Sequence, residues 1–187
     1  MSLFNYINEI NEINEIIPHL YLSNWFTSNN TEVLNKYKIK AVITLETRPK
    51  PDNVLIYYKN YGIDNMYISL PDSPDANITQ YFDKTYDFIN KHISKGENVL
   101  VHCMAGVSRS ATIVINYILR KMYENNEVTT CPCRLLNEVM DYVRTKRPIV
   151  NPNDGFMKQL LSAAMQYQKD WRQNYDKQYN RVFASIK

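Results

Sequence analysis

Cys103 and Arg109 are the two residues whose types and spacing most clearly indicate chemistry. Five residues separate them, within the segment VHCMAGVSRSATIVINYI from Val101 to Ile118. A cysteine attacks as a thiolate, which inward-pointing backbone N–H groups and the positive end of a helix dipole both stabilise. Here an apolar stretch ends at Cys103, a short loop follows, and a helical pattern begins near Arg109. The segment therefore predicts a nucleophilic cysteine beneath a helix N-terminus.

The same loop can bind a phosphate group. Successive inward-pointing N–H groups form a concave anion site, and Gly106 allows the left-handed turn that such a site needs. The planar guanidinium of Arg109 can bind two oxygens of one anion at once. The hydroxyl of Ser110 is placed to donate a hydrogen bond to the cysteine sulfur and so assist its departure. The alternative for Ser110 is that it only caps the helix.

Alternating strands and helices must hold this loop in place. We predict strands at 19–23, 41–45, 66–70 and 98–103, and helices at 31–38, 78–93, 109–124, 133–146 and from about 153. The two prolines of RPKPD, residues 48–52, predict a loop. This alternation is typical of a single α/β domain with a mostly parallel central sheet flanked by helices. No second domain is expected.

Composition narrows the function classes. The 187 residues are 44% hydrophobic and 22% charged, as in one folded domain. The net charge is +3 without a basic block, so no nucleic-acid surface is expected. The odd count of three cysteines favours a reducing compartment. With no signal peptide or membrane-spanning run in the sequence, we expect a cytoplasmic protein (the nucleus being the second choice) without membrane association.

The run His102-Cys103-x-x-Gly106-x-Ser108-Arg109-Ser110 resembles the signature of the protein tyrosine phosphatase superfamily, and closely that of its dual-specificity branch. Flanking segments resemble the same branch in the same order: IIPHLYLS with KIKAVITL, ISLPDSPDANITQYFDKTYDFI, and RTKRPIVNPNDGFMKQL. The resemblance covers roughly residues 16–165. We therefore expect an N-terminal lead-in at 1–15, a catalytic domain at 16–165 and a helical extension at 166–187.

The resemblance implies a reaction sequence for the loop. Cys103 would attack phosphorus and form a phosphocysteine. Arg109 would bind the phosphoryl oxygens as their charge shifts in the transition state. Backbone amides would bind the same oxygens, and they belong to Met104, Ala105, Gly106, Val107, Ser108 and Arg109. The mechanism implies no metal and no cofactor.

Residues outside the phosphate-binding loop also match the family. Asp72 would be the general acid that protonates the leaving group and then activates water. Asp75, in the same turn-rich loop, is the alternative, and aspartates there can simply form turns. His102 would hold the loop and help to keep the thiolate charged. Asn153 would orient the loop, although it can also be a plain N-cap of the last helix.

Three features lie outside the family pattern. Ser23 stands where the branch usually has Gly, a difference that we expect to affect only a surface turn. Residues 46–64 have their own sequence in a region that can border the active cleft, so no substrate preference is predicted from them. Cys131 and Cys133 lack a second pair of metal ligands, so we expect reduced, partly exposed thiols in a loop that enters a helix.

We predict a protein phosphatase that hydrolyses phosphotyrosine and phosphoserine/threonine in phosphorylated protein substrates. The phosphotyrosine-recognition loop and Trp-Pro-Asp acid loop of the larger tyrosine-specific enzymes do not occur in this sequence. Residues 1–15 alone precede the match, so we expect no kinase-docking domain, as in the small atypical members.

The alternatives are a phosphoprotein-binding scaffold of low activity, or a phosphatase for a phosphoinositide or an RNA 5′ end. A scaffold would be expected to lack Cys, Arg or Asp, and all three are present. Lipid-directed relatives tend to carry lysines in the loop, whereas Met104, Ala105 and Val107 are uncharged. An RNA-directed enzyme would need a basic, aromatic-lined approach, which the sequence does not show.

Both ends of the chain carry a regular pattern. NEINEINEI, residues 8–16, predicts a short amphipathic lead-in or a frayed tail. Tyr167, Trp171, Tyr175 and Tyr179 recur every fourth residue. This row predicts a long helix that packs on its own domain, or alternatively a face for a partner or for self-association.

Overall fold

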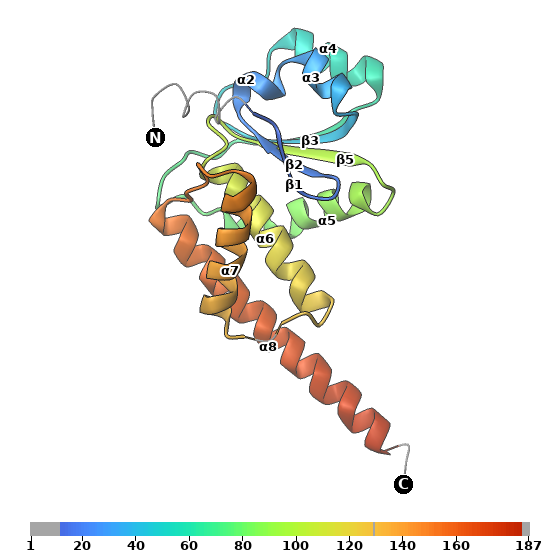
Figure 1. Ribbon diagram of the computed structural model, residues 1–187, viewed down its shortest axis with the longest axis vertical. Helices are drawn as coiled ribbons and strands as arrows, with labels where there is room; N and C mark the ends of the chain where they lie inside the picture. Colours follow the sequence, from blue (N-terminus) through green and yellow to red (C-terminus); the bar gives the residue numbers. More distant parts are fainter. Residues whose placement is uncertain (1–11, 129, 185–187) are drawn as a thin grey trace.

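The computed structural model describes residues 12–128 and 130–184, and a five-stranded sheet lies at the centre of these residues (Figure 1). The strands are β1 (Asn14–Ile17), β2 (Leu20–Ser23), β3 (Ile39–Leu45), β4 (Asp64–Ile68) and β5 (Asn98–His102). Their order is β1-β2-β5-β3-β4, and the β1–β2 pairing alone among them is antiparallel. The predicted mostly parallel sheet is confirmed.

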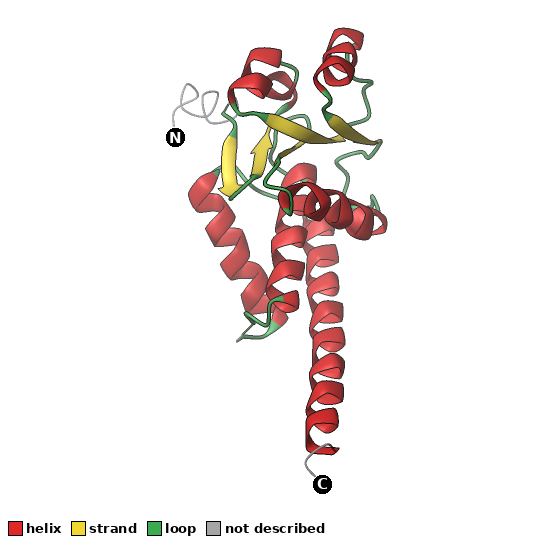
Figure 2. Ribbon diagram, turned by 90° about the vertical axis from the view of Figure 1, so that its right-hand side faces the viewer, coloured by secondary structure: helices red, strands yellow, loops and turns green. Residues whose placement is uncertain are grey.

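Helices cover both faces of the sheet (Figures 1 and 2). One face carries α2 (Trp25–Ser28), α3 (Thr31–Lys36) and α4 (Asp52–Tyr61). The other carries α5 (Phe82–Ile93), entered through the 3₁₀ turn η1 (Thr79–Tyr81), together with α6 (Arg109–Glu124), α7 (Pro132–Lys146) and α8 (Asp154–Ala184). The α/β architecture with flanking helices is thus the one that the sequence predicts.

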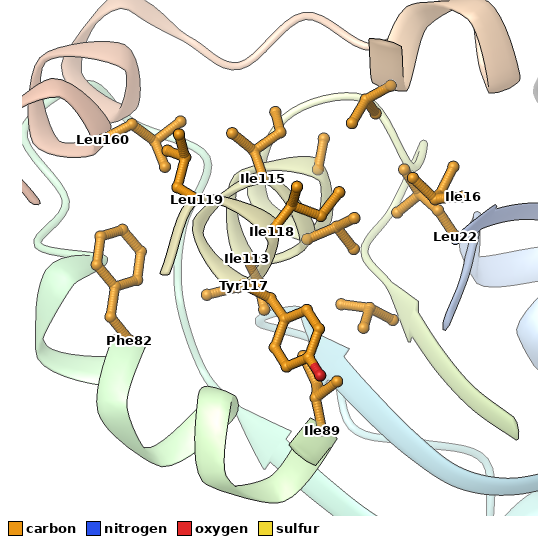
Figure 3. Close-up of a cluster of buried hydrophobic side chains, with 14 of the residues drawn as sticks. Ile16, Leu22, Phe82, Ile89, Ile113, Ile115, Tyr117, Ile118, Leu119 and Leu160 are labelled. Carbon is orange, nitrogen blue, oxygen red and sulfur yellow. The ribbon is translucent and has the colours of Figure 1, made fainter. Parts of the chain in front are cut away.

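The central strands β3 and β5 are predominantly apolar because both of their faces are buried. Successive side chains of β3 point to opposite sides. Ile43 joins the larger apolar cluster, beneath α5 to α8, whereas Val42 joins the smaller one, beneath α3 and α4. Figure 3 shows the larger cluster around α6, with Ile113 and Leu119 among its members.

Three short elements were not predicted from the sequence. Helix α4 occupies part of the unassigned stretch 46–64, and Pro51 is its N-cap, so the prolines there end a loop and open a helix. Helix α2 is only four residues long. Strand β1 contains the end of the NEI repeat, and the side chain of its Ile16 is buried in the larger apolar cluster. The expectation of a helical or frayed segment is wrong for these residues. Residues 8–11 of the repeat lie outside the described residues.

The expectation that Ser23 lies in a surface turn is also wrong. Ser23 is the last residue of β2, is fully buried, and pairs with His102 at the end of β5. Parallel neighbours end at the same edge of a sheet, so the residue that ends β2 lies beside the loop that follows β5. Ser23, which stands where the family usually has Gly, therefore lies beside the predicted phosphate-binding loop.

Helix α8 packs along its own domain and then extends beyond the other helices (Figure 2). Tyr167 donates a hydrogen bond to Asn116 over 2.9 Å, and Trp171 donates one to Asn126 over 2.6 Å. Tyr175 stacks on Trp171 and is 56% exposed; the side chain of Tyr179 lies outside the described residues. Within the described chain, no helix combines the length and apolarity needed to cross a membrane.

Candidate active site

The loop from Cys103 to Ser108 lies at the carboxyl edge of the sheet, between β5 and α6. Cys103 is only 1% exposed. Its sulfur accepts hydrogen bonds from the Gly106 N–H over 3.3 Å and from the Ser110 hydroxyl over 3.1 Å. Ser110 thus sits in the first turn of α6 and points at the sulfur, while the N-cap position is taken by Ser108. Both donors stabilise negative charge on sulfur.

Gly106 is the one position of this loop with a positive φ, +69°. A Cβ there would lie 2.4 Å from the Ser23 carbonyl oxygen and 2.7 Å from Nη2 of Arg147. The backbone of β2 and a buried guanidinium therefore close the outer side of the loop, and a glycine alone fits against them. The left-handed turn predicted for Gly106 is present.

Arg147 holds the outer side of the loop and was missed in the sequence. It is fully buried at the C-cap of α7. Its Nε donates to the Gly106 carbonyl over 2.9 Å, and Nη2 donates to the Ala105 carbonyl over 3.1 Å. Carbonyls held outward leave the amide N–H groups of the loop facing inward. In the sequence this residue cannot be told from the basic residues common at helix C-termini.

Two backbone hydrogen bonds complete the support. The N–H of Trp25 donates to the Met104 carbonyl over 3.1 Å, and that of Asn151 donates to the Val107 carbonyl over 2.9 Å. The loop is therefore fastened from both flanks by residues distant in sequence. This is the geometry of an anion-binding concavity built from main-chain N–H groups.

The guanidinium of Arg109 is buried at the mouth of this concavity. Its Nη1 donates to the Leu70 carbonyl over 3.0 Å and lies 3.5 Å from Oε1 of Glu46. Its Nε lies 3.6 Å from Oδ2 of Asp72 and forms no hydrogen bond within the described residues. The Leu70 carbonyl and the Glu46 carboxylate thus fix the Nη1 side of the Arg109 guanidinium.

Glu46 is a second residue that the sequence did not reveal. It follows β3 and is 3% exposed. Burial opposes ionisation of its carboxyl, but the Thr47 N–H and the Arg109 guanidinium outweigh this effect and lower its pKa. Glu46 is therefore a carboxylate at neutral pH, and it fixes Arg109 by charge as well as by position.

Asp72 is hydrogen-bonded to residues that adjoin Arg109 and the loop. Its Oδ1 accepts hydrogen bonds from the Ser108 hydroxyl over 2.7 Å and from Nδ2 of Asn153 over 2.8 Å. The Asn153 N–H donates to Ser108, and its Oδ1 caps α8 by accepting from the Phe156 N–H. Asn153 is thus both an N-cap and a contact of the loop. Asp75 is exposed, and within the described residues its N–H bonds to Ser73 in the same turn, so the geometry favours Asp72 over Asp75.

The loop that carries Asp72 is pressed against the first turn of α8. A Cβ on Gly155 would lie 1.9 Å from the Pro74 carbonyl oxygen. Gln159 accepts a hydrogen bond from the Ile78 N–H and donates one to the Ala76 carbonyl. These contacts hold the segment that follows Asp72 against α8, so the position of Asp72 depends on the start of this helix.

Gly155→Ala is therefore expected to displace Asp72 and lower turnover of a phosphomonoester by about 10- to 100-fold, because misplacement by about 1 Å can cost that much. Alanine otherwise favours a helix over glycine, so a loss reports the contact with Pro74. The measurement is kcat on p-nitrophenyl phosphate, with the exposed Ser162→Ala of the same helix as the control. An unchanged kcat in Gly155→Ala would show that the loop adapts without moving Asp72.

His102 lies beneath Cys103 and is fully buried. Its Nε2 is 2.8 Å from the Thr44 hydroxyl and 2.9 Å from Nζ of Lys50, and its Nδ1 is 3.3 Å from the Cys103 carbonyl. Burial, assisted by the charge of Lys50, lowers the pKa of His102 well below its usual value. The imidazole is therefore neutral at neutral pH and supports the loop by hydrogen bonding rather than by charge.

Lys50 is a buried amine that the sequence left unassigned. Its Nζ donates to Asn29 over 2.8 Å and lies over the rings of Trp25 and Tyr58. Burial lowers the pKa of Lys50 to about 7. The site thus contains a lysine that changes charge near neutrality, in direct contact with His102.

Lys50→Met is expected to alter the pH dependence of stability. The folded protein holds Lys50 with a pKa of about 7, below the ordinary 10.5, so the unfolded chain binds more protons between these pH values. The unfolding free energy of the wild type therefore rises between pH 7 and pH 10, by about 1.4 kcal/mol for each pH unit. Urea unfolding should show the wild type gaining a few kcal/mol relative to Lys50→Met across this range.

The control for this measurement is Lys40→Met, because Lys40 is exposed on β3. It should follow the wild-type pH dependence. If Lys50→Met also follows it, Lys50 keeps its ordinary affinity for protons in the folded protein.

Cys131 and Cys133 lie at the start of α7 and are exposed, as expected. Across the described ranges 12–128 and 130–184, no three His, Cys, Asp or Glu side chains are placed to hold a metal ion. The sequence-predicted residues of the phosphate loop, with Asp72 and Asn153, are instead gathered around one concavity.

Comparison with known proteins decides the family. A model described as the catalytic domain of dual specificity phosphatases matches residues 20–166. The chain belongs to the dual specificity phosphatase family. Human dual specificity protein phosphatase 22 is 31% identical over 164 residues, which cover 88% of this chain and 80% of that relative. The resemblance seen in the sequence is thus confirmed.

Mouse dual specificity protein phosphatase 15 is 30% identical over 167 residues, 89% of this chain. The chain spans 64% of the length of that relative, less than two thirds. The crystal structure of DUSP15 superposes with a TM-score of 0.71 at 30% identity, over 89% of this chain and 96% of that one. Fold and family therefore agree with the dual specificity phosphatases.

Proposed function

We propose that this chain is a cysteine-dependent protein phosphatase that hydrolyses phosphotyrosine and phosphoserine/threonine in protein substrates. The observation that carries the proposal is the arrangement around Cys103. Its sulfur accepts two hydrogen bonds at the base of a main-chain N–H concavity, and Arg109 and Asp72 lie 3.6 Å apart at the mouth. Membership of the dual specificity phosphatase family supports both the reaction and the range of substrates.

In the first step, the Cys103 thiolate attacks phosphorus and the ester P–O bond breaks. Asp72 gives its proton to the leaving oxygen. The N–H groups of the loop and the Arg109 fork bind the equatorial oxygens, where negative charge is concentrated in the transition state. Glu46 and the Leu70 carbonyl keep the guanidinium in place for this contact.

In the second step, the Asp72 carboxylate takes a proton from water, whose oxygen attacks phosphorus as the S–P bond breaks. Phosphate leaves and Cys103 returns as a thiolate. The Ser110 hydroxyl, 3.1 Å from the sulfur, stabilises the departing charge. Asn153 and Ser108 hold Asp72 in position for both proton transfers.

We further propose residues 16–165 as the catalytic domain and a cytoplasmic signalling role for the protein. The nucleophile must stay reduced, and the cytosol keeps thiols reduced. The loop side chains Met104, Ala105 and Val107 carry no charge that would select a substrate with a further phosphate.

The test compares wild type, Asp72→Asn and the control Asp75→Asn on phosphotyrosine and phosphothreonine peptides in the presence of EDTA. Wild type and Asp75→Asn should hydrolyse both peptides. Asp72→Asn should lose about 10²- to 10⁴-fold in kcat, the usual contribution of a general acid. Turnover of phosphotyrosine alone would remove the dual specificity, and peptide binding by a folded wild type without turnover would favour a phosphoprotein-binding scaffold.

The intermediate can be seen directly. With p-nitrophenyl phosphate, whose leaving group needs little protonation, Asp72→Asn should accumulate the phosphoenzyme because its second step is slow. Acid quench and tryptic digestion should then place the phosphate on the peptide of residues 96–109, which contains Cys103. Phosphate on any other peptide would assign the nucleophile elsewhere.

A further inference from the structure

A pair of thiols outside the catalytic concavity has a geometry suited to chemistry of its own. The sulfurs of Cys131 and Cys133 lie 3.1 Å apart, and both cysteines are exposed. They flank Pro132, the first residue of α7. Arg147, which contacts the phosphate loop, lies at the opposite end of this 15-residue helix, whose length is about 22 Å at 1.5 Å per residue.

We propose that Cys131 and Cys133 form a redox-active dithiol that small disulfides convert into an intramolecular disulfide. The backbone is arranged for this before reaction. Cys131 is extended, with φ −71° and ψ 157°, and Pro132 fixes the first helical φ. The two side chains therefore meet on one side of the chain, and a disulfide needs the sulfurs to approach from 3.1 Å to about 2.05 Å.

The two thiols are not equivalent. A hydrogen bond from Cys133 and the N–H of Arg134, at the start of α7, lower the pKa of the Cys131 thiol. The same sulfur–sulfur hydrogen bond raises the pKa of Cys133. Helix N-termini stabilise thiolates in this way. Cys131 is thus the attacking thiolate, and Cys133 is the thiol that completes the exchange.

The exchange proceeds in two displacements. The Cys131 thiolate attacks one sulfur of glutathione disulfide, forming a mixed disulfide and releasing glutathione thiolate. Cys133 then loses its proton and attacks the Cys131 sulfur, which expels the second glutathione thiolate and forms the Cys131–Cys133 bond. The dithiol loses two electrons and two protons, and glutathione disulfide becomes two molecules of glutathione.

Cys103 is distinguished from this pair by burial and by position in the chain. It is almost fully buried, whereas the dithiol is exposed. Trypsin also separates them, because residues 96–109 contain Cys103 and residues 122–134 contain both Cys131 and Cys133. One digest therefore reports the two sites independently, and the measurement does not depend on phosphatase activity.

The experiment incubates the full chain in glutathione buffers of increasing disulfide content, quenches with acid, alkylates free thiols in denaturant and analyses the digest by mass spectrometry. The peptide of residues 122–134 is expected to become unreactive to alkylation and lighter by two hydrogens. Dithiothreitol should reverse this change. Persistent glutathione adducts, or an unmodified peptide at every ratio tested, would overturn the proposal.

Two single variants test whether the two sulfurs bond to each other. Cys133→Ser should stop at a glutathione adduct on Cys131, because no second thiol completes the exchange. Cys131→Ser should stop in the same way at an adduct on Cys133. A peptide of residues 122–134 that is still lighter by two hydrogens in either variant would contradict the Cys131–Cys133 bond.

Discussion

Cys103→Ser is expected to lower kcat on p-nitrophenyl phosphate by at least about 10⁴-fold, since loss of a covalent nucleophile is among the largest single effects in enzymes. A serine hydroxyl holds its proton far more tightly than a thiol, so the Gly106 N–H and the Ser110 hydroxyl cannot generate the alkoxide. The smaller serine oxygen can still accept both hydrogen bonds, whose donor atoms lie 3.3 and 3.1 Å from the sulfur in the wild type. Folding of the loop should therefore be preserved.

Calorimetric titration with a phosphopeptide provides the second readout for this variant. Cys103→Ser should bind the peptide within a few-fold of the affinity of Asp72→Asn, because the amides and Arg109 remain. The control is Cys131→Ser, which removes an exposed thiol distant from the loop and should keep wild-type kcat. Residual turnover of a few per cent in Cys103→Ser would mean that water or another residue attacks phosphorus.

Arg109→Lys is expected to lower kcat/KM by about 10²- to 10³-fold although the charge is kept. Lysine offers a point charge, whereas arginine binds two phosphoryl oxygens with one planar fork. The wild-type fork is fixed from behind by the Leu70 carbonyl at 3.0 Å and by Glu46 at 3.5 Å. A flexible ammonium cannot satisfy these contacts and the transition state together.

Two further variants separate chemistry from folding. Arg134→Lys, whose wild-type side chain is 74% exposed in an ion pair with Glu138, should leave both activity and melting temperature unchanged. Glu46→Gln keeps a hydrogen-bond acceptor behind Arg109 but removes the charge, so it should reduce kcat/KM less than Arg109→Lys does. If Arg109→Lys retains wild-type kcat/KM, the two-oxygen contact is not needed for the reaction.

The parts of the site that lie together in sequence could be predicted from it. Cys103, Gly106, Arg109 and Ser110 occupy one strand–loop–helix segment, where spacing alone constrains geometry. The central strands were equally predictable, because burial on both faces demands continuous apolar runs. Asp72 was assigned by family resemblance, and the structure places its carboxylate beside Arg109 and Ser108.

The supporting residues could not be predicted, because each reaches the loop from a distant segment. Arg147, Glu46 and Lys50 are charged residues in stretches that read as a helix end or a loop, and charged residues are usually exposed there. Their burial depends on how β3, α4 and α7 pack, which no local pattern encodes. Ser23 was misplaced for the same reason, since its burial follows from the pairing of β2 with β5.

Arg147 joins the Gly106 carbonyl to the Glu12 carbonyl, residues that lie 41 and 135 positions away from it along the chain. Forming contacts of such large sequence separation requires the closure of long loops, which costs conformational entropy and slows folding. The support of the Cys103–Ser108 loop is thus completed only when both ends of the domain have come together. During synthesis, a nascent chain that still lacks Arg147 already contains all five strands of the sheet, but not the guanidinium that holds the Ala105 and Gly106 carbonyls outward.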